Sequence, residues 1–278
     1  MSTLKPGIYP GLSYREYDAI DAVRASLLKM FDRTPAHARY EMLHPKGDTA
    51  ALRMGDALHA AILEPRRFEA EYACKPGCDR RTNAGKAASA QWDAAHPGTV
   101  ALLEDEWAAV TAMRDAVLAH PTAAALVRGQ GRNELVIVWE DAETGLMCKA
   151  RVDRITDYHG FTVVPDLKTC RDASPKAFSK VIAEYGYHMQ AAFYLNGLAT
   201  VAPLKQGVRR FVFLCVENTP PHCVACYEPE DSVIEEGRRQ YRAKLDAYAR
   251  GKKEGIWPGY MNGLVPLDIP KWAYREEA

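Results

Sequence analysis

Residues 134–170 read ELVIVWEDAETGLMCKARVDRITDYHGFTVVPDLKTC, and this stretch decides the fold. It contains three runs of apolar, β-branched and aromatic residues, which predict consecutive strands at 135–139, 147–155 and 161–169. Asp-Ala-Glu-Thr-Gly at 141–145 has the composition of a turn, and His159-Gly160 is a second turn signal. The segment therefore predicts an antiparallel sheet on which the rest of the chain is built.

The hairpin predicted at His159-Gly160 brings ionisable side chains together. If the loop has two residues, Asp153 lies opposite Asp166, and opposed residues of a ladder share a face. If the loop has three residues, with Gly160 in a left-handed conformation, the opposition shifts by one residue and a bulge restores it. Lys168 follows Asp166 by two residues and points to the same face. Facing carboxylates repel each other, so this patch needs a counter-ion, either Lys168 or a divalent cation.

Pro165 immediately precedes Asp166. Proline donates no ladder hydrogen bond, so it marks a sheet edge or a place where two strands separate. Strands that separate around facing carboxylates form a cleft. An Asp-x-Lys pattern alone is usually a solvated strand end, and Pro165 together with Asp153 shifts the interpretation towards a reactive site.

Two predicted helices carry further candidates. A helix from about residue 48 to 63, capped by Asp48, places Gly55 and His59 one turn apart, and the glycine permits close backbone approach. A lone histidine on such a helix is more often a core residue than a ligand. A second helix, at 187–198, places Gln190 and Tyr194 one turn apart. Either pair could simply be part of the packing.

Taken together, these motifs resemble the core of the PD-(D/E)xK nuclease superfamily. The motifs, in chain order, are Gly55-x-x-x-His59, Arg151-Val152-Asp153, Pro165-Asp166-Leu167-Lys168 and Gln190-x-x-x-Tyr194. Within the superfamily, the chain is most similar to the RecE (exonuclease VIII) type of phage recombination exonuclease, which is related to lambda exonuclease and RecB-type nuclease domains. The resemblance extends from about residue 12 to residue 260.

The resemblance implies an α/β fold with a restriction-endonuclease-like core, in which helices flank a central mixed sheet beside a helical N-terminal part. It implies two Mg²⁺ or Mn²⁺ ions, with ligands from His59, Asp153, Asp166 and the Leu167 carbonyl. The implied catalytic residues are Asp153, Asp166, Lys168, Gln190 and Tyr194. Glu134 is expected to support the ligands from behind.

The resemblance further implies a DNA exonuclease that degrades linear double-stranded ends from 5′ to 3′. A ring-shaped homo-oligomer and a single-strand annealing protein as partner are implied in the same way. Two alternatives stay open. One is a structure-specific or single-strand endonuclease on the same core, and the other is a non-hydrolytic DNA-binding recombination scaffold.

DNA contacts are predicted outside the motifs. Arg80, Arg81 and Lys86 precede or begin a predicted helix and could bind phosphates at its N-terminus, or they could form a solvated loop. Arg171 lies in a basic region just after the Asp-x-Lys motif. Lys and Arg number 36, as do Asp and Glu, so the net charge of zero weighs mildly against nucleic acid. A local channel can nevertheless be basic.

The 278 residues are predicted to form a single nuclease domain. Its parts are a mainly helical N-terminal part at 1–130, the catalytic sheet and Gln190–Tyr194 helix at 131–230, and a C-terminal helix and tail at 231–278.

The cysteines and the apolar runs bear on the compartment. Seven cysteines form no regular framework, and no apolar run is long enough to cross a membrane, so we expect a cytoplasmic bacterial or phage-encoded protein. Some relatives of this fold hold an iron–sulphur cluster. None is expected here, because Cys215 and Cys223 fall in strand-like runs and the spacing departs from the cluster pattern.

Overall fold

A mixed sheet of six strands forms the centre of the molecule. The computed structural model describes residues 4–274 except 46, 48, 80 and 204–208. In this part of the chain the strand order is β1-β4-β5-β6-β7-β8, with β6 and β7 parallel and the other neighbours antiparallel. This confirms the predicted fold class. The strands are β1 (Gly7–Tyr9), β4 (Gly131–Glu140), β5 (Met147–Tyr158), β6 (Phe161–Cys170), β7 (Arg210–Glu217) and β8 (Val224–Tyr227).

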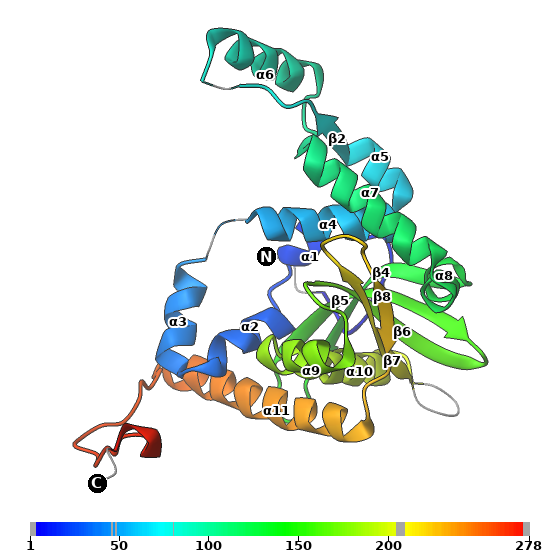
Figure 1. The fold of residues 1–278 in the computed structure, drawn as a ribbon. Coiled ribbons are helices and arrows are strands. Elements are labelled where there is room, and N and C mark those ends of the chain that lie inside the picture. Colours follow the sequence, from blue (N-terminus) through cyan, green and yellow to red (C-terminus); the bar gives the residue numbers. More distant parts are fainter. Residues whose placement is uncertain (1–3, 46, 48, 80, 204–208, 275–278) are drawn as a thin grey trace.

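Helices cover both faces of the sheet (Figure 1). On one face α10 (Tyr187–Val201) contacts β4 and β5, and α11 (Asp231–Glu254) packs on α10. On the other face α4 (Ala50–Leu63) contacts β5 and β6, and α7 (Glu104–Ala119) contacts β7. The remaining helices are α1 (Tyr14–Asp18), α2 (Ala25–Lys29), η1 (Met30–Asp32), α3 (Pro35–Leu43), α5 (Pro65–Glu71), α6 (Asn83–Ala95), α8 (Pro121–Arg128), α9 (Pro175–Glu184) and η2 (Lys271–Ala273).

The turn between β5 and β6 sets the register of the central hairpin. His159 and Gly160 both have a left-handed φ, 48° and 82°, as a two-residue hairpin loop requires. Pairing between the strands ends at Thr156 opposite Val163. In the same register Asp153 would lie opposite Asp166, but pairing with β5 does not continue beyond Val163, while β6 stays paired with β7 along its other edge as far as Cys170. The strands therefore separate where the proline before Asp166 predicts a separation.

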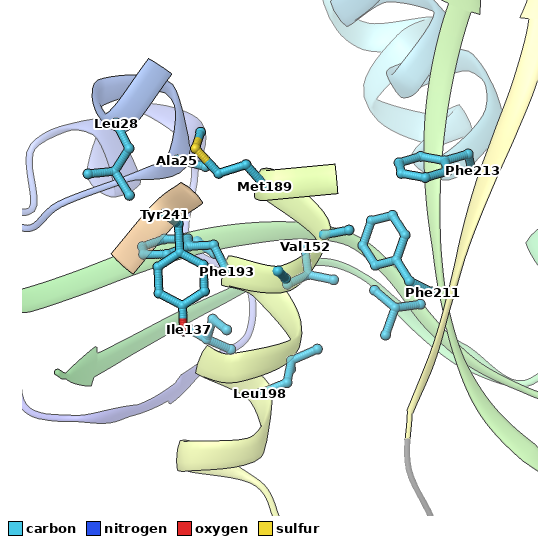
Figure 2. Packing of buried hydrophobic residues seen from close by; sticks show 14 of the residues in the cluster. Ala25, Leu28, Ile137, Val152, Met189, Phe193, Leu198, Phe211, Phe213 and Tyr241 are labelled. Carbon is cyan, nitrogen blue, oxygen red and sulfur yellow. The ribbon is translucent and has the colours of Figure 1, made fainter. Parts of the chain in front are cut away.

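The larger core lies between the sheet and α10 (Figure 2). The Trp139 ring of β4 lies 4.7 Å from that of Phe193 on α10, between ring centroids. A Cβ on Gly197 would come within 2.6 Å of the Trp139 ring, so this glycine permits the close approach of α10. Buried side chains around this contact include Leu28, Ile137, Val152, Met189, Leu198 and Phe213.

A second core holds α4 over the opposite face. Ala57, Leu58 and Ala61 of α4 pack with Leu167 of β6 and with apolar residues of α7 and β7. The N-cap of the helix is Thr49, whose hydroxyl accepts a hydrogen bond from the Leu52 amide. Thr49 therefore provides the cap that was predicted for Asp48, which itself lies outside the described residues.

The N-terminal part also contains strands that the sequence did not predict. β1 pairs with the edge of β4, while β2 (Tyr72–Lys75) and β3 (Val100–Leu103) form a small parallel sheet of their own. Each is only three or four residues long, too short for a clear alternation. The small sheet carries α6, which projects away from the central sheet (Figure 1). Among the described residues, no helix has both the length and the apolar character that a membrane crossing needs.

Candidate active site

Three side chains that are far apart in the sequence converge where β5 and β6 separate. His59 comes from α4, Glu134 from β4 and Asp153 from β5. Each offers one donor atom, and these atoms all lie within 4.8 Å of one another. His59 Nδ1 is 3.6 Å from Asp153 Oδ2 and 3.9 Å from Glu134 Oε1. We call these three residues the His59 cluster.

The backbone of Leu167 joins this cluster from β6. Its amide donates a hydrogen bond of 2.8 Å to Asp153 Oδ2, and its carbonyl oxygen lies 3.2 Å from His59 Nε2. Both groups are accessible to these partners because β5 no longer pairs with β6 at this level. The strand separation therefore exposes a peptide group that can act as donor and as ligand.

Glu134 reaches the cluster through an unusual backbone conformation. Its φ is 50°, which is rare for a residue with a side chain, and its ladder partner would be Asp153. Pairing passes from Asn133 to Leu135 without that pair. Arg151 Nε lies 2.9 Å from Glu134 Oε2 and compensates part of its charge. Such strain persists only where the surroundings enforce it, and it frequently marks a functional position.

The electrostatics of the cluster favour a cation. Burial by itself lowers the pKa of His59, but Asp153 and Glu134 outweigh it and raise that pKa to about 9. Both ring nitrogens of His59 face acceptors, so a protonated ring occupies the place of a positive ion. Two carboxylates, a carbonyl and an imidazole suit Mg²⁺ or Mn²⁺. The donor set thus fits a divalent ion, which would displace the proton on binding.

Asp166 and Lys168 form a second group beside the first. They make an ion pair with each other, and Gln190 Nε2 donates a hydrogen bond of 3.1 Å to Asp166 Oδ1. The Lys168 ammonium also lies 4.9 Å from the centre of the Tyr187 ring. Burial opposes its charge, but Asp166 and Asp153 raise the pKa of Lys168, so it remains an ammonium.

The predicted metal ligands are therefore divided between two groups. His59, Asp153 and the Leu167 carbonyl lie together, whereas Asp166 contacts Lys168 and Gln190. Glu134, expected only behind the ligands, stands among the donors instead. Gly55, expected to allow a close backbone approach, would meet nothing within 4 Å if it carried a Cβ. That expectation was wrong for contacts within the described part of the chain.

Tyr194 lies on α10 one turn after Gln190 and packs at the margin of the larger core. Burial and then the nearby Tyr17 and Asp166 raise the pKa of its hydroxyl well above the ordinary range, so it stays neutral. Its predicted contact with the substrate strand stays a prediction.

The predicted DNA-binding residues are not gathered at this site. Lys86 is exposed on α6, which projects from the body, and Arg81 just before it pairs with Asp79. Arg171 is exposed directly after β6, next to the Asp166–Lys168 pair in sequence. Arg80 lies outside the described residues.

Two further residues contact the site in ways that were not predicted. Arg151 belongs to one of the motifs, and strand alternation places it on the face of Asp153, where it pairs with Glu134. Tyr187 starts α10 and had no local signal, because its role depends on contact with Lys168 from another element.

The mixed sheet and the acids and lysine at its separated strands define a nuclease core of the PD-(D/E)xK class. Residues 25–264 match the model of a family described as "PDDEXK-like domain of unknown function (DUF3799)", and the chain belongs to that family. This confirms the superfamily that the motifs predicted.

One solved structure supports the same fold. A crystal structure from Eubacterium rectale named "Putative exonuclease" matches with a TM-score of 0.61 at 12% identity, covering 94% of this chain and 97% of that chain. At this identity the likeness shows the fold alone. A structure named "SSO0001" has a TM-score of 0.29 at 16% identity, covering 69% of this chain and 86% of that chain. This score is too low to indicate a shared fold. No curated protein matches the chain.

Proposed function

We propose that this protein is a divalent-metal-dependent deoxyribonuclease that hydrolyses phosphodiester bonds at the ends of linear double-stranded DNA. The observation that carries the proposal is that the His59 cluster contacts the Leu167 peptide while the two residues that flank Leu167, Asp166 and Lys168, form an ion pair beside it. The family and the fold support a nuclease, and the name of the Eubacterium rectale structure supports an exonuclease.

His59, Glu134, Asp153 and the Leu167 carbonyl would hold the ion. A divalent ion there would neutralise charge on the phosphate and increase the acidity of a water molecule. Asp166, which now pairs with Lys168, would contribute to the second ion that the resemblance implies. The number and identity of the ions stay predictions.

Lys168 would act directly on the reacting phosphate. Its ammonium is fixed by Asp166 and by the Tyr187 ring, so it needs little reorganisation to bind a phosphate oxygen or orient the attacking water. Gln190 holds Asp166 in place from α10. Positively charged donors held in a dry site stabilise the charge that develops during hydrolysis.

The finer assignment rests on the RecE-type resemblance. We propose 5′ to 3′ polarity, a role in phage-type recombination, a ring-shaped homo-oligomer and a single-strand annealing protein as partner. An endonuclease on the same core, or a scaffold without hydrolysis, remains the alternative for each of these assignments.

The test is incubation of the protein with Mg²⁺ and three DNAs: a linear duplex labelled at the 5′ end, the same duplex labelled at the 3′ end, and a closed circle. A 5′ to 3′ exonuclease releases the 5′ label first and leaves the circle intact. Cutting of the circle would identify an endonuclease. Failure to cut any DNA in Mg²⁺ or Mn²⁺ would support the scaffold and overturn the proposal.

Matched variants locate the activity. Lys168→Ala and Asp153→Asn should each reduce turnover at least about a hundredfold, since both remove charge next to the reacting phosphate. Lys180→Ala, an exposed lysine on α9, should leave turnover unchanged. Circular dichroism must show that all three variants stay folded.

A further inference from the structure

Lys29 lies beside the proposed active site without a role in it. It is the last residue of α2, which packs against α10 and α11. Its ammonium is 5.0 Å from the centre of the Tyr187 ring, and that of Lys168 is 4.9 Å from the same centre. One aromatic ring therefore contacts two ammonium groups that repel each other.

Lys29 has no acidic partner that would explain this placement. Among the described residues no carboxylate lies within ion-pair distance of its ammonium, and Asp32 pairs with Lys244 instead. Burial, and then the charge of Lys168, lower the pKa of Lys29 to about 8. Holding such a cation costs stability, so its surroundings are better suited to an anion that arrives from outside.

Lys29 also lines a hollow of about 350 Å³ on the surface. Ser26, Lys29 and Arg33 line it from successive turns, and they offer a hydroxyl and two positive charges. Arg33 is oriented by a 2.9 Å hydrogen bond to the Tyr260 hydroxyl. The acids on the wall are Asp32, already paired, and Glu41. Lys244 balances the charge of Asp32, so two cations and a hydroxyl stand against the single carboxylate of Glu41, and this balance favours an anion such as a phosphate.

We propose that Lys29 binds a non-bridging oxygen of a phosphate next to the scissile one in the DNA backbone, and that the Tyr187 ring, which both ammonium groups contact, keeps Lys29 close to Lys168. This inference rests on the proposed function. It assigns to α2 a contact that fixes the substrate strand relative to Lys168, and it explains why two lysines contact one ring.

The experiment measures binding of a fluorescein-labelled linear duplex by anisotropy, with Ca²⁺ in place of Mg²⁺ to prevent turnover. The affinity is followed between about 50 and 200 mM salt. Lys29→Gln should bind several-fold more weakly and reduce the slope of log affinity against log salt by about 0.9, the loss of one phosphate contact. Lys29→Met keeps an unbranched side chain without the charge and should give the same loss, whereas Lys29→Arg should retain the slope.

Lys252→Gln is the matched control, because Lys252 is exposed near the far end of α11 and should leave both values unchanged. A full wild-type slope in folded Lys29→Gln and Lys29→Met would overturn the inference. No binding by the wild-type protein would instead overturn the proposed function. A structural role for Lys29 predicts lower melting temperatures at an unchanged salt slope, and that result would also count against the phosphate contact.

Discussion

At the scale of single residues, Glu134 departs furthest from expectation. Its side chain was expected behind the metal ligands, but it lies among the candidate donor atoms because its backbone adopts a left-handed φ of 50°. Hairpin pairing could be predicted from local turn chemistry, and it correctly placed Asp153 near β6. The position of Glu134 depends on Arg151 and on α4, which lies far away in the sequence, and no pattern along one strand reveals such contacts.

Glu134→Gln should weaken Mn²⁺ binding at least about tenfold, because an amide oxygen carries no charge to balance the ion. Isothermal titration calorimetry measures this affinity. Glu140→Gln is the control, since Glu140 is an exposed acid at the end of the same strand. Equal affinity of the two variants would remove Glu134 from the ligands.

The pH dependence of DNA binding should report on Lys29. Its ammonium is surrounded by Lys168, Asp166, Asp32 and Lys244, and burial with Lys168 lowers its pKa to about 8. Wild-type affinity should therefore fall between pH 7 and 9 as the charge is lost, while Lys29→Arg should not follow this fall. In anisotropy titrations, parallel curves for the two proteins would contradict the prediction.

The lowered pKa of Lys29 also makes the stability of the protein depend on pH, and here a higher pH is favourable. Folding lowers this pKa from 10.5, so the unfolded chain binds more protons between about pH 8 and pH 10.5. The contribution of Lys29 to the free energy of unfolding should therefore increase as the pH rises through that window. Urea titrations of the wild-type protein and Lys29→Met, compared at pH 7.5 and 10, measure the contribution.

At the scale of elements, Lys149 of β5 binds the chain at residues 17–20 through hydrogen bonds. Its buried ammonium donates to the carbonyls of Tyr17, Asp18 and Ile20 at 2.8, 3.0 and 2.7 Å. Lys149→Met would leave these acceptors without a donor and should lower the free energy of unfolding by about 3 kcal/mol. Urea denaturation measures the loss, and Lys180→Met on the exposed side of α9 should cost almost nothing.

Two helical glycines should respond to alanine in opposite ways. A Cβ on Gly237 would lie 2.1 Å from the His188 carbonyl oxygen, so Gly237→Ala must push α11 away from α10 and should destabilise by about 2 kcal/mol or more. A Cβ on Gly55 meets nothing within 4 Å, so Gly55→Ala should stabilise by roughly 0.5–1 kcal/mol. Melting temperatures that move in the same direction would contradict this reading of the packing.

At the scale of the whole molecule, the motifs predicted the central sheet and several residues that meet in the candidate site, but they did not predict how elements far apart in sequence meet. Asp153, Asp166 and Lys168 belong to one hairpin, so turn length and strand alternation define their relation. The pairing of β1 with β4, and the meeting of α2, β6 and α10 around Tyr187, depend on the packing of the complete chain.

Removing divalent ions by chelation should affect hydrolysis but not folding. Two apolar cores hold the elements that carry the His59 cluster, so EDTA should stop hydrolysis without unfolding the protein. Added Mg²⁺ should raise the melting temperature in a concentration-dependent way, as expected for a ligand of the native state. Unchanged hydrolysis in EDTA would rule out metal catalysis, and unfolding in EDTA would show that the ion is structural.

The side chain and the peptide group of Leu167 make different contacts, and an alanine scan would detect only those of the side chain. Its side chain is buried beneath α4, while its peptide group serves His59 and Asp153. Leu167→Ala would remove packing contacts and lower the free energy of unfolding, but it would leave the peptide group in place. A backbone ester introduced by chemical synthesis, which replaces the Leu167 N–H by oxygen, would remove the donor to Asp153 and leave the side chain in place.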